Sequence, residues 1–256
     1  MSEILQHREA GVLTLTLNRL DKKNALTAAM YATLADALRD AAADEQVRVV
    51  VIQGHEQVFT AGNDLQDFRD NPPNPAATEP APVHRFLHEL TTFPKPLLAA
   101  VAGPAVGIGT TLLLHCDLVY AGDNAAFSLP FVNLGLCPEA GSSVLLPALA
   151  GYQRAAEKLL LGEAFYADEA HDMGLVNRVV PPHEVNAYTQ AQAAKLSAKP
   201  LASLRVTKAL MKRSQPGLKA VIDEEFAQFG QLLRGPACKE AIDAFMSKRK
   251  PDFSQC

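Results

Sequence analysis

The chain has 256 residues, of which 48% are hydrophobic and 20% charged, so it can fold around a large core without disulfides. Its formal net charge of −4 excludes the strongly basic composition of many nucleic-acid-binding proteins, and we expect no nucleic-acid partner. The four cysteines lack the paired spacing of a zinc site or disulfide scaffold, which favours free thiols in a reducing, cytoplasmic compartment.

The sequence of the N-terminal half predicts several strands and a helix between the first two. Val12–Asn18 is expected to be a half-buried strand, because leucines alternate there with threonines. After a polar turn, apolar residues recur at helical spacing from Leu26 to Ala41, and Asn24 or Thr27 is the expected N-cap. Further strands are predicted at Val47–Gly54, Pro96–Val101 and Asp117–Ala121.

Two segments between these strands need a separate interpretation. Pro96–Cys116 has no charged residue and is about long enough to cross a bilayer, but its central glycines and prolines break any single helix. We therefore expect a buried strand, turn and helix there, and no membrane partner. Asp70–Val83 contains five prolines, which predicts a long loop, and such loops are often functional.

The second half of the chain is mostly helical. Alternating strands and helices followed by helices alone predict an α/β fold with a buried sheet, with residues 1–199 as the core and 200–256 as a C-terminal helical region. Helices are predicted at Ala155–Leu161, Ala167–Met173, Glu184–Ala198, Ala202–Lys212, Leu218–Leu233 and Cys238–Lys248.

Two glycine-containing turns follow apolar strands, at Phe59–Leu65 and Val101–Gly109. A turn that opens a helix points backbone N–H groups outward at the positive end of the helix dipole, where they can hold an anion or a developing oxyanion. Either turn alone is equally consistent with a tight strand–helix connection, and the second lacks the third glycine of a dinucleotide-binding site.

Several motifs in fixed order resemble the crotonase (enoyl-CoA hydratase/isomerase) superfamily over essentially the whole chain. That resemblance implies a spiral of β-β-α units, an acyl-CoA thioester substrate, and a homotrimer or hexamer assembled through the C-terminal helices. The motifs are Asn18-Arg19, Lys23-Asn24-Ala25-Leu26, the Phe59–Leu65 and Gly103–Gly109 turns, Gly162-Glu163, Gly174–Pro181 and Ala244–Phe253.

The resemblance also implies the roles of individual residues. The N–H groups of Asn63 and Ile108 correspond to the oxyanion hole that receives the thioester oxygen, although Ile108 replaces the glycine common in the family. The carbonyl of Ala61 corresponds to the group that contacts the adenine of coenzyme A. The other expected coenzyme A contacts are Lys23, Ala25, Asp64, Leu65, Phe245 and Lys248, of which the last two often act from a neighbouring subunit.

The acidic residues distinguish the possible activities. Family hydratases use two glutamates, and this chain has Thr111 and Phe131 at those positions. Glu139, the one charged residue between Asp123 and Arg154, matches the single glutamate of the peroxisomal Δ3,Δ2-enoyl-CoA isomerases. A carboxyl buried there without partners would have a raised pKa, as suits a general base. Glu139 is alternatively a carboxylate that stabilises a helix N-terminus.

These residues predict an isomerase that moves the double bond of an enoyl-CoA from C3 to C2. Glu139 would take a proton from C2 and return it to C4 while the oxyanion hole holds the enolate. No metal or cofactor is required, because coenzyme A is part of the substrate. An enoyl-CoA hydratase, an isomerase of ring or epoxide thioesters, and a non-catalytic CoA-binding protein remain alternatives.

Overall fold

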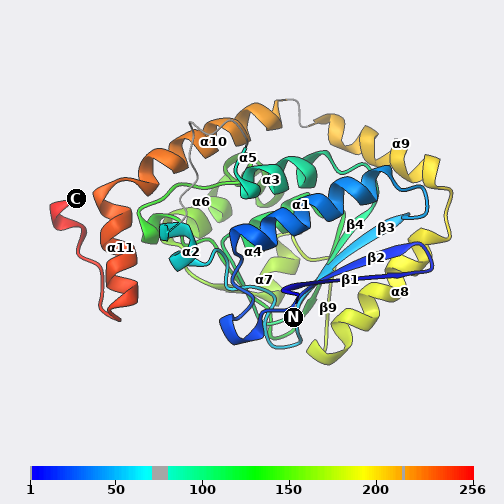
Figure 1. The fold of residues 1–256 in the computed structure, drawn as a ribbon, viewed down its shortest axis with the longest axis horizontal. Helices are drawn as coiled ribbons and strands as arrows, with labels where there is room; N and C mark the ends of the chain where they lie inside the picture. Colours follow the sequence, from blue (N-terminus) through cyan, green and yellow to red (C-terminus); the bar gives the residue numbers. More distant parts are fainter. Residues whose placement is uncertain (1, 71–79, 215–216) are drawn as a thin grey trace.

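The computed structural model describes residues 2–70, 80–214 and 217–256. In this part of the chain, one sheet has the strand order β1-β2-β3-β4-β6-β9, and a smaller sheet has the order β5-β7-β8 (Figure 1). The strands are β1 (Ile4–Glu9), β2 (Val12–Leu17), β3 (Val49–Gln53), β4 (Leu97–Val101), β5 (Pro104–Val106), β6 (Leu118–Gly122), β7 (Ala126–Ser128), β8 (Phe165–Tyr166) and β9 (Arg178–Val180).

The central strands are parallel and covered on both faces, which explains the continuous apolar sequences of β3 and β4. In β3, Val50 and Ile52 belong to a large core shared with α1 (Ala28–Ala43) and α3 (Pro82–Thr92). Val49 and Val51 point to the opposite face and pack in a second cluster with residues of α8 (Val185–Ser197). The predicted strands are confirmed to within two residues at each end.

The helix predicted from Leu26 is α1, and Thr27 is its N-cap. The Thr27 hydroxyl accepts a hydrogen bond from the Met30 N–H at 3.3 Å. Asn24, the other candidate, instead lies buried in a left-handed conformation, and its amide donates to the Phe59 carbonyl at 3.0 Å. Asn24 therefore fastens the first glycine turn rather than capping the helix.

Helices dominate the chain beyond β7, as predicted, with ends that shift by up to three residues. In Figure 1, α10 runs along the top of the molecule above α3, and α11 lies at the left end, away from the main sheet. The remaining helices are α2 (Leu65–Asp70), α4 (Ile108–Thr111), α5 (Ser142–Ala150), α6 (Tyr152–Leu161), α7 (Ala167–Asp172), α9 (Leu201–Met211), α10 (Leu218–Leu233) and α11 (Pro236–Met246). Short 3-10 turns lie at Leu20–Lys22, Leu112–His115, Val132–Leu134, Pro182–Glu184, Lys212–Ser214 and Phe253–Gln255.

Two further expectations concern the proline segment and the domain boundary. Most of the predicted proline loop lies outside the described residues. Pro82, however, belongs to the first turn of α3, where a backbone N–H would have no partner within the helix, so proline loses no hydrogen bond there. The division at residue 200 stays a prediction, although Phe229, Cys238 and Ile242 from the C-terminal region pack into the same core as the sheet.

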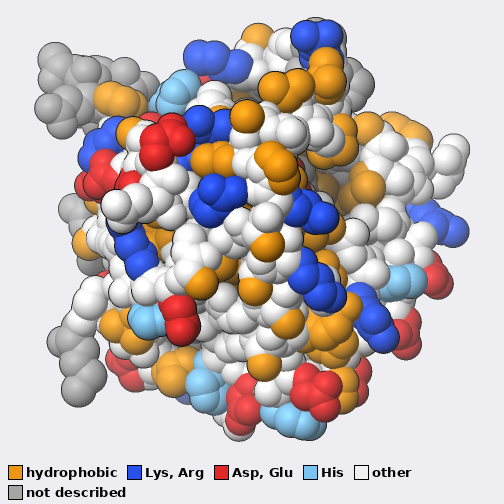
Figure 2. All heavy atoms as spheres, turned by 90° about the vertical axis from the view of Figure 1, so that its right-hand side faces the viewer, with side chains coloured by type: hydrophobic (Ala, Val, Ile, Leu, Met, Phe, Trp, Pro, Cys, Tyr) orange, Lys and Arg blue, Asp and Glu red, His pale blue; other side chains and the backbone are white. Residues whose placement is uncertain are grey.

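The surface carries mixed chemistry. On the face shown in Figure 2, hydrophobic side chains are interspersed with lysines, arginines and acidic residues. Within the described ranges, no helix combines the length and the apolar character needed to span a membrane.

Candidate active site

Backbone hydrogen bonds bring the two glycine turns side by side. The N–H of Val106 donates to the Thr60 carbonyl at 3.0 Å, and the N–H of Thr60 donates to the Pro104 carbonyl at 3.0 Å. Gly62 has a φ of +90°, and a Cβ there would lie 2.8 Å from the Val106 carbonyl oxygen. Only glycine allows the turns to approach this closely.

The two N–H groups expected to form an oxyanion hole follow these glycines. Ile108 is the first residue of α4, after Gly107, whose φ is +55°. Within the described ranges, neither the Asn63 N–H nor the Ile108 N–H donates a hydrogen bond. Ile108 is 2% exposed, and its side chain packs in the core. Two free donors on adjacent turns are what a thioester oxygen would need.

A cleft of about 930 Å³ runs past both turns. Its volume lies in the range of small-molecule sites. Phe245 reaches it from α11 and is 63% exposed, whereas Lys248, beyond the end of that helix, is not among the lining residues of the described chain. The cleft is lined by the other residues expected to bind coenzyme A, Lys23, Ala25, Ala61, Asp64, Leu65 and Phe245, and by Asn63 and Ile108.

Asp64 stabilises the loop that forms part of the wall of this cleft. Its carboxylate accepts a hydrogen bond from the Arg19 guanidinium at 2.7 Å and from the backbone N–H groups of Gln66 and Asp67 at 3.1 Å. Asp64 therefore fixes the shape of the loop that follows Asn63. Lys23 is exposed and places a cationic side chain at the cleft.

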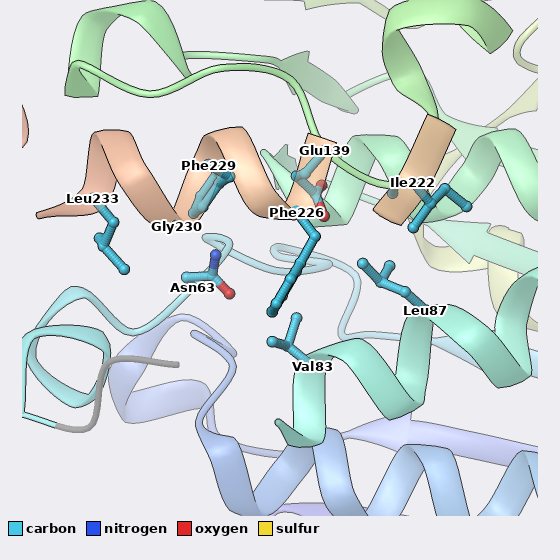
Figure 3. Close-up of a pocket in the computed structure, with 10 residues that line it drawn as sticks. Asn63, Val83, Leu87, Glu139, Ile222, Phe226, Phe229, Gly230 and Leu233 are labelled. Atoms are coloured by element: carbon cyan, nitrogen blue, oxygen red, sulfur yellow. The ribbon is translucent and has the colours of Figure 1, made fainter. Parts of the chain in front are cut away.

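A smaller apolar pocket of about 30 Å³ continues from the cleft, and Asn63 and Phe229 line both. Figure 3 shows this pocket between α3 and α10, with the Phe226 side chain extending from α10 toward Val83 of α3. Glu139 lines the same pocket, together with Leu87, Ala140, Ile222, Gly230 and Leu233. The expected general base thus shares a small, mostly apolar cavity with Asn63.

The Glu139 carboxyl is buried and carries a strongly altered pKa. Burial, opposed by a hydrogen bond from Thr111 and reinforced by the negative charge of Glu225, raises the pKa of Glu139 to about 7. The sequence predicted a raised pKa for a carboxyl without partners, whereas the structure gives Glu139 a hydroxyl donor. A carboxyl that titrates near neutrality can both accept and return a proton.

Sequence reasoning missed three residues that support this site. Thr111, interpreted only as a missing glutamate, donates its hydroxyl to Oε1 of Glu139. Tyr31 of α1 donates its phenol to Oδ1 of Asn63 at 2.5 Å, and burial raises the Tyr31 pKa well above its ordinary value. The third is Glu225 of α10. Tyr31 and Glu225 each place a polar group on the buried face of a predicted helix, and this pattern could have indicated that they contact the site.

The contacts of Glu225 also concern the alternative role of Glu139, in which the Glu139 carboxylate would stabilise a helix N-terminus. The Glu225 carboxylate accepts hydrogen bonds from the N–H groups of Gly141 at 2.5 Å and Ser143 at 3.0 Å, at the N-terminus of α5. The helix N-terminus is therefore occupied by a carboxylate from α10. The Glu139 side chain faces Thr111 and the pocket instead.

Comparison with known proteins identifies the family. The profile of the enoyl-CoA hydratase/isomerase family matches residues 7–256, so the chain belongs to this family, within the crotonase superfamily. The chain is 35% identical to 1,2-epoxyphenylacetyl-CoA isomerase and 38% identical to 2,3-dehydroadipyl-CoA hydratase, both of Escherichia coli, over 99% of this chain and of each relative. It is 40% identical to rat enoyl-CoA delta isomerase 2, over 97% of this chain and 64% of the relative.

Solved structures confirm the crotonase-type α/β fold. OdaA of Pseudomonas aeruginosa superposes with a TM-score of 0.92 at 48% identity, covering 96% of this chain and 99% of that one. An enoyl-CoA hydratase/isomerase from Pseudoalteromonas atlantica gives a TM-score of 0.93 at 37% identity, covering 99% and 100%. The relatives include hydratases and isomerases, so family membership establishes an enzyme of this family and leaves its reaction to the site residues.

Proposed function

We propose that this enzyme moves the double bond of an enoyl-CoA from C3 to C2, with Glu139 as its single proton-transferring base. The observation that carries the proposal is the position of Glu139, a buried carboxyl with a pKa of about 7 in an apolar pocket that also contains Asn63. Rat enoyl-CoA delta isomerase 2 is one of the relatives whose names match this reaction.

The reaction balances without a co-reactant. The ionised Glu139 removes a proton from C2, and the electron pair of that C–H bond forms an enolate. The enolate oxygen accepts hydrogen bonds from the N–H groups of Asn63 and Ile108. When the enolate collapses, the C2–C3 double bond forms. The electrons of the former C3–C4 double bond then take the proton from Glu139 at C4.

The same residues argue against hydration. Adding water across a double bond needs one group to activate water and another to protonate carbon. At the two positions that the family resemblance assigns to these groups, Thr111 is committed to Glu139 and Phe131 is a buried apolar side chain. Each missing proton-transfer group should cost about 10²–10⁴-fold in rate.

The test compares two reactions with one enzyme preparation and matched chain lengths. Isomerisation of 3-hexenoyl-CoA and hydration of 2-hexenoyl-CoA are followed under the same conditions. We expect isomerisation to be faster by about 10²-fold or more. Hydration at an equal or greater rate would contradict the proposal, as would the absence of both reactions, which would leave an isomerase of ring or epoxide thioesters or a non-catalytic CoA-binding protein.

A second candidate is isomerisation of an epoxide or ring thioester. It is favoured by the 35% identity to 1,2-epoxyphenylacetyl-CoA isomerase over nearly the full length of both proteins. Phe226 and Phe229 line the inner pocket and offer aromatic faces to an aryl acyl group, for which the pocket of about 30 Å³ would have to widen. Turnover of 1,2-epoxyphenylacetyl-CoA at a higher kcat/KM than 3-hexenoyl-CoA would favour this candidate over the first.

A further inference from the structure

Helix α10 brings a second buried carboxylate to the loop that carries Glu139. Glu225 is 8% exposed, and its two oxygens accept hydrogen bonds from Gly141 and Ser143. The same helix supplies Ile222, Phe226 and Phe229 to the inner pocket. Glu225 does not line that pocket, so it is placed to act on Glu139 rather than on the substrate.

The loop needs support because its backbone is unusual. Ala140 and Gly141 are consecutive left-handed residues, with φ values of +58° and +74°, and the first carries a side chain. Three further hydrogen bonds hold this bend: one between His115 Nε2 and the Ala140 carbonyl at 2.7 Å, and two from the Ser142 hydroxyl and N–H to the Glu139 carbonyl at 2.6 and 3.0 Å. These bonds restrain the turn, and Glu225 joins it to α10.

The N-terminus of α5 is the other reason why Glu225 matters. Its N-cap is Gly141, which has no side chain to accept the free N–H groups of the first turn. A carboxylate is favoured at this positive end of the helix. Glu139 lies only three residues before Ser142, the first helical residue, and would be the local candidate if Glu225 were absent.

We propose that Glu225 is a positioning residue: it occupies the N-terminus of α5 from α10 and thereby holds the Glu139 side chain toward Thr111 and the pocket. The inference rests on the proposed role of Glu139 as the base. It adds a charge effect to the geometry, because the negative charge of Glu225 opposes ionisation of Glu139. Without Glu225, the dipole of α5 would stabilise the ionised Glu139. The loss of the Glu225 charge and the exposure of Glu139 to the dipole would therefore both favour ionisation of Glu139.

The other titratable groups near Glu139 are neutral around pH 7. Tyr31 of α1 and Cys137 of the same loop have pKa values raised by burial. Burial lowers the pKa of His115, which contacts the adjacent Ala140, to about 4. Thr111 does not titrate. The charge on Glu225 is therefore the one whose removal should change the proton affinity of Glu139.

The test measures the titration of Glu139 directly. The infrared band of its protonated carboxyl is identified as the one that Glu139→Gln lacks, and its midpoint is followed in Glu225→Gln. Glutamine keeps an acceptor for one backbone N–H and removes the charge. We expect the midpoint to fall by about one pH unit or more. The acidic limb of the pH profile of kcat/KM for 3-hexenoyl-CoA should move to lower pH by the same amount. A second uncharged variant, Glu225→Met, should give the same shift.

Glu224→Gln is the matched control, because Glu224 is exposed on the same turn of α10 and should leave the midpoint unchanged. An unchanged midpoint in a folded Glu225 variant would overturn the inference, as would a loss of turnover that is equal at every pH. If the wild-type enzyme does not isomerise 3-hexenoyl-CoA, the proposed function fails. The infrared titration still decides the role of Glu225 in that case.

Discussion

The hydroxyl of Thr111 donates a hydrogen bond to Oε1 of Glu139 in the interior of the protein. The family resemblance aligns Thr111 with a catalytic glutamate of the hydratases, and in this structure the Thr111 hydroxyl supports Glu139 instead. The bond favours the ionised form of Glu139 and opposes the effect of burial on its pKa.

The first prediction concerns Thr111→Val, which removes this donor at nearly constant volume. The pKa of Glu139 should rise above 7 by about one unit, because a hydrogen bond to a charged group contributes about 1.5–3 kcal/mol. Since the ionised form is the base, kcat/KM for isomerisation at pH 7 should fall about fivefold and recover by about pH 9. The measurement is the pH dependence of kcat/KM for 3-hexenoyl-CoA.

Thr110→Val serves as the control for this shift. The Thr110 hydroxyl donates to the Ala105 carbonyl at 2.5 Å and makes no contact with Glu139. Its acidic limb should stay where the wild-type limb is. An acidic limb that does not move in Thr111→Val would show that the hydroxyl does not act on the base.

The second prediction concerns stability. A carboxyl whose pKa is raised from 4.5 to about 7 stabilises the folded state fully below pH 4.5, and that contribution is lost as the pH rises through 7. Glu139→Gln should therefore increase the free energy of unfolding at alkaline pH, by up to about 3 kcal/mol. Urea unfolding should show the gain growing by about 2 kcal/mol from pH 5.5 to pH 8.5. A gain independent of pH would contradict the raised pKa.

The third prediction concerns assembly through the C-terminal region. Val206 and Leu210 of α9 are 59% and 50% exposed, and Met246 of α11 is 48% exposed. Burial of such side chains between copies would be favourable. Light scattering at micromolar concentration should give three times the chain mass of 27.5 kDa, or a multiple of that trimer. Leu210→Lys should shift the protein toward smaller species, and a wild-type monomer would contradict the prediction.

The parts of the fold with a periodic apolar pattern could be predicted from the sequence. The alternating leucines of β2 and the capped helix α1 are examples. β1 was not predicted, because this edge strand buries only Ile4 and exposes its other side chains. The very short strands β5, β7 and β8 contain too few residues for any period.

The residues of the candidate site also form two groups, those that local sequence motifs indicate and those that packing brings in from distant segments. Asn63 and Ile108 lie in the two glycine turns noted in the sequence, and Glu139 lies in an apolar segment that the family resemblance singles out. Their partners come from distant segments: Tyr31 is 32 positions from Asn63, and Glu225 is 84 positions from Gly141. Such contacts are created by the packing of α1 and α10 against the turns, which local spacing does not encode.

The central claim is that Glu139 is the base, and Glu139→Gln tests it most directly. Glutamine retains the size of the side chain and an acceptor for Thr111 but cannot take a proton. The kcat for 3-hexenoyl-CoA should fall by about 10²-fold or more, while the Kd for saturated hexanoyl-CoA, measured by calorimetry, stays near the wild-type value. Near-wild-type turnover by this variant would contradict the account.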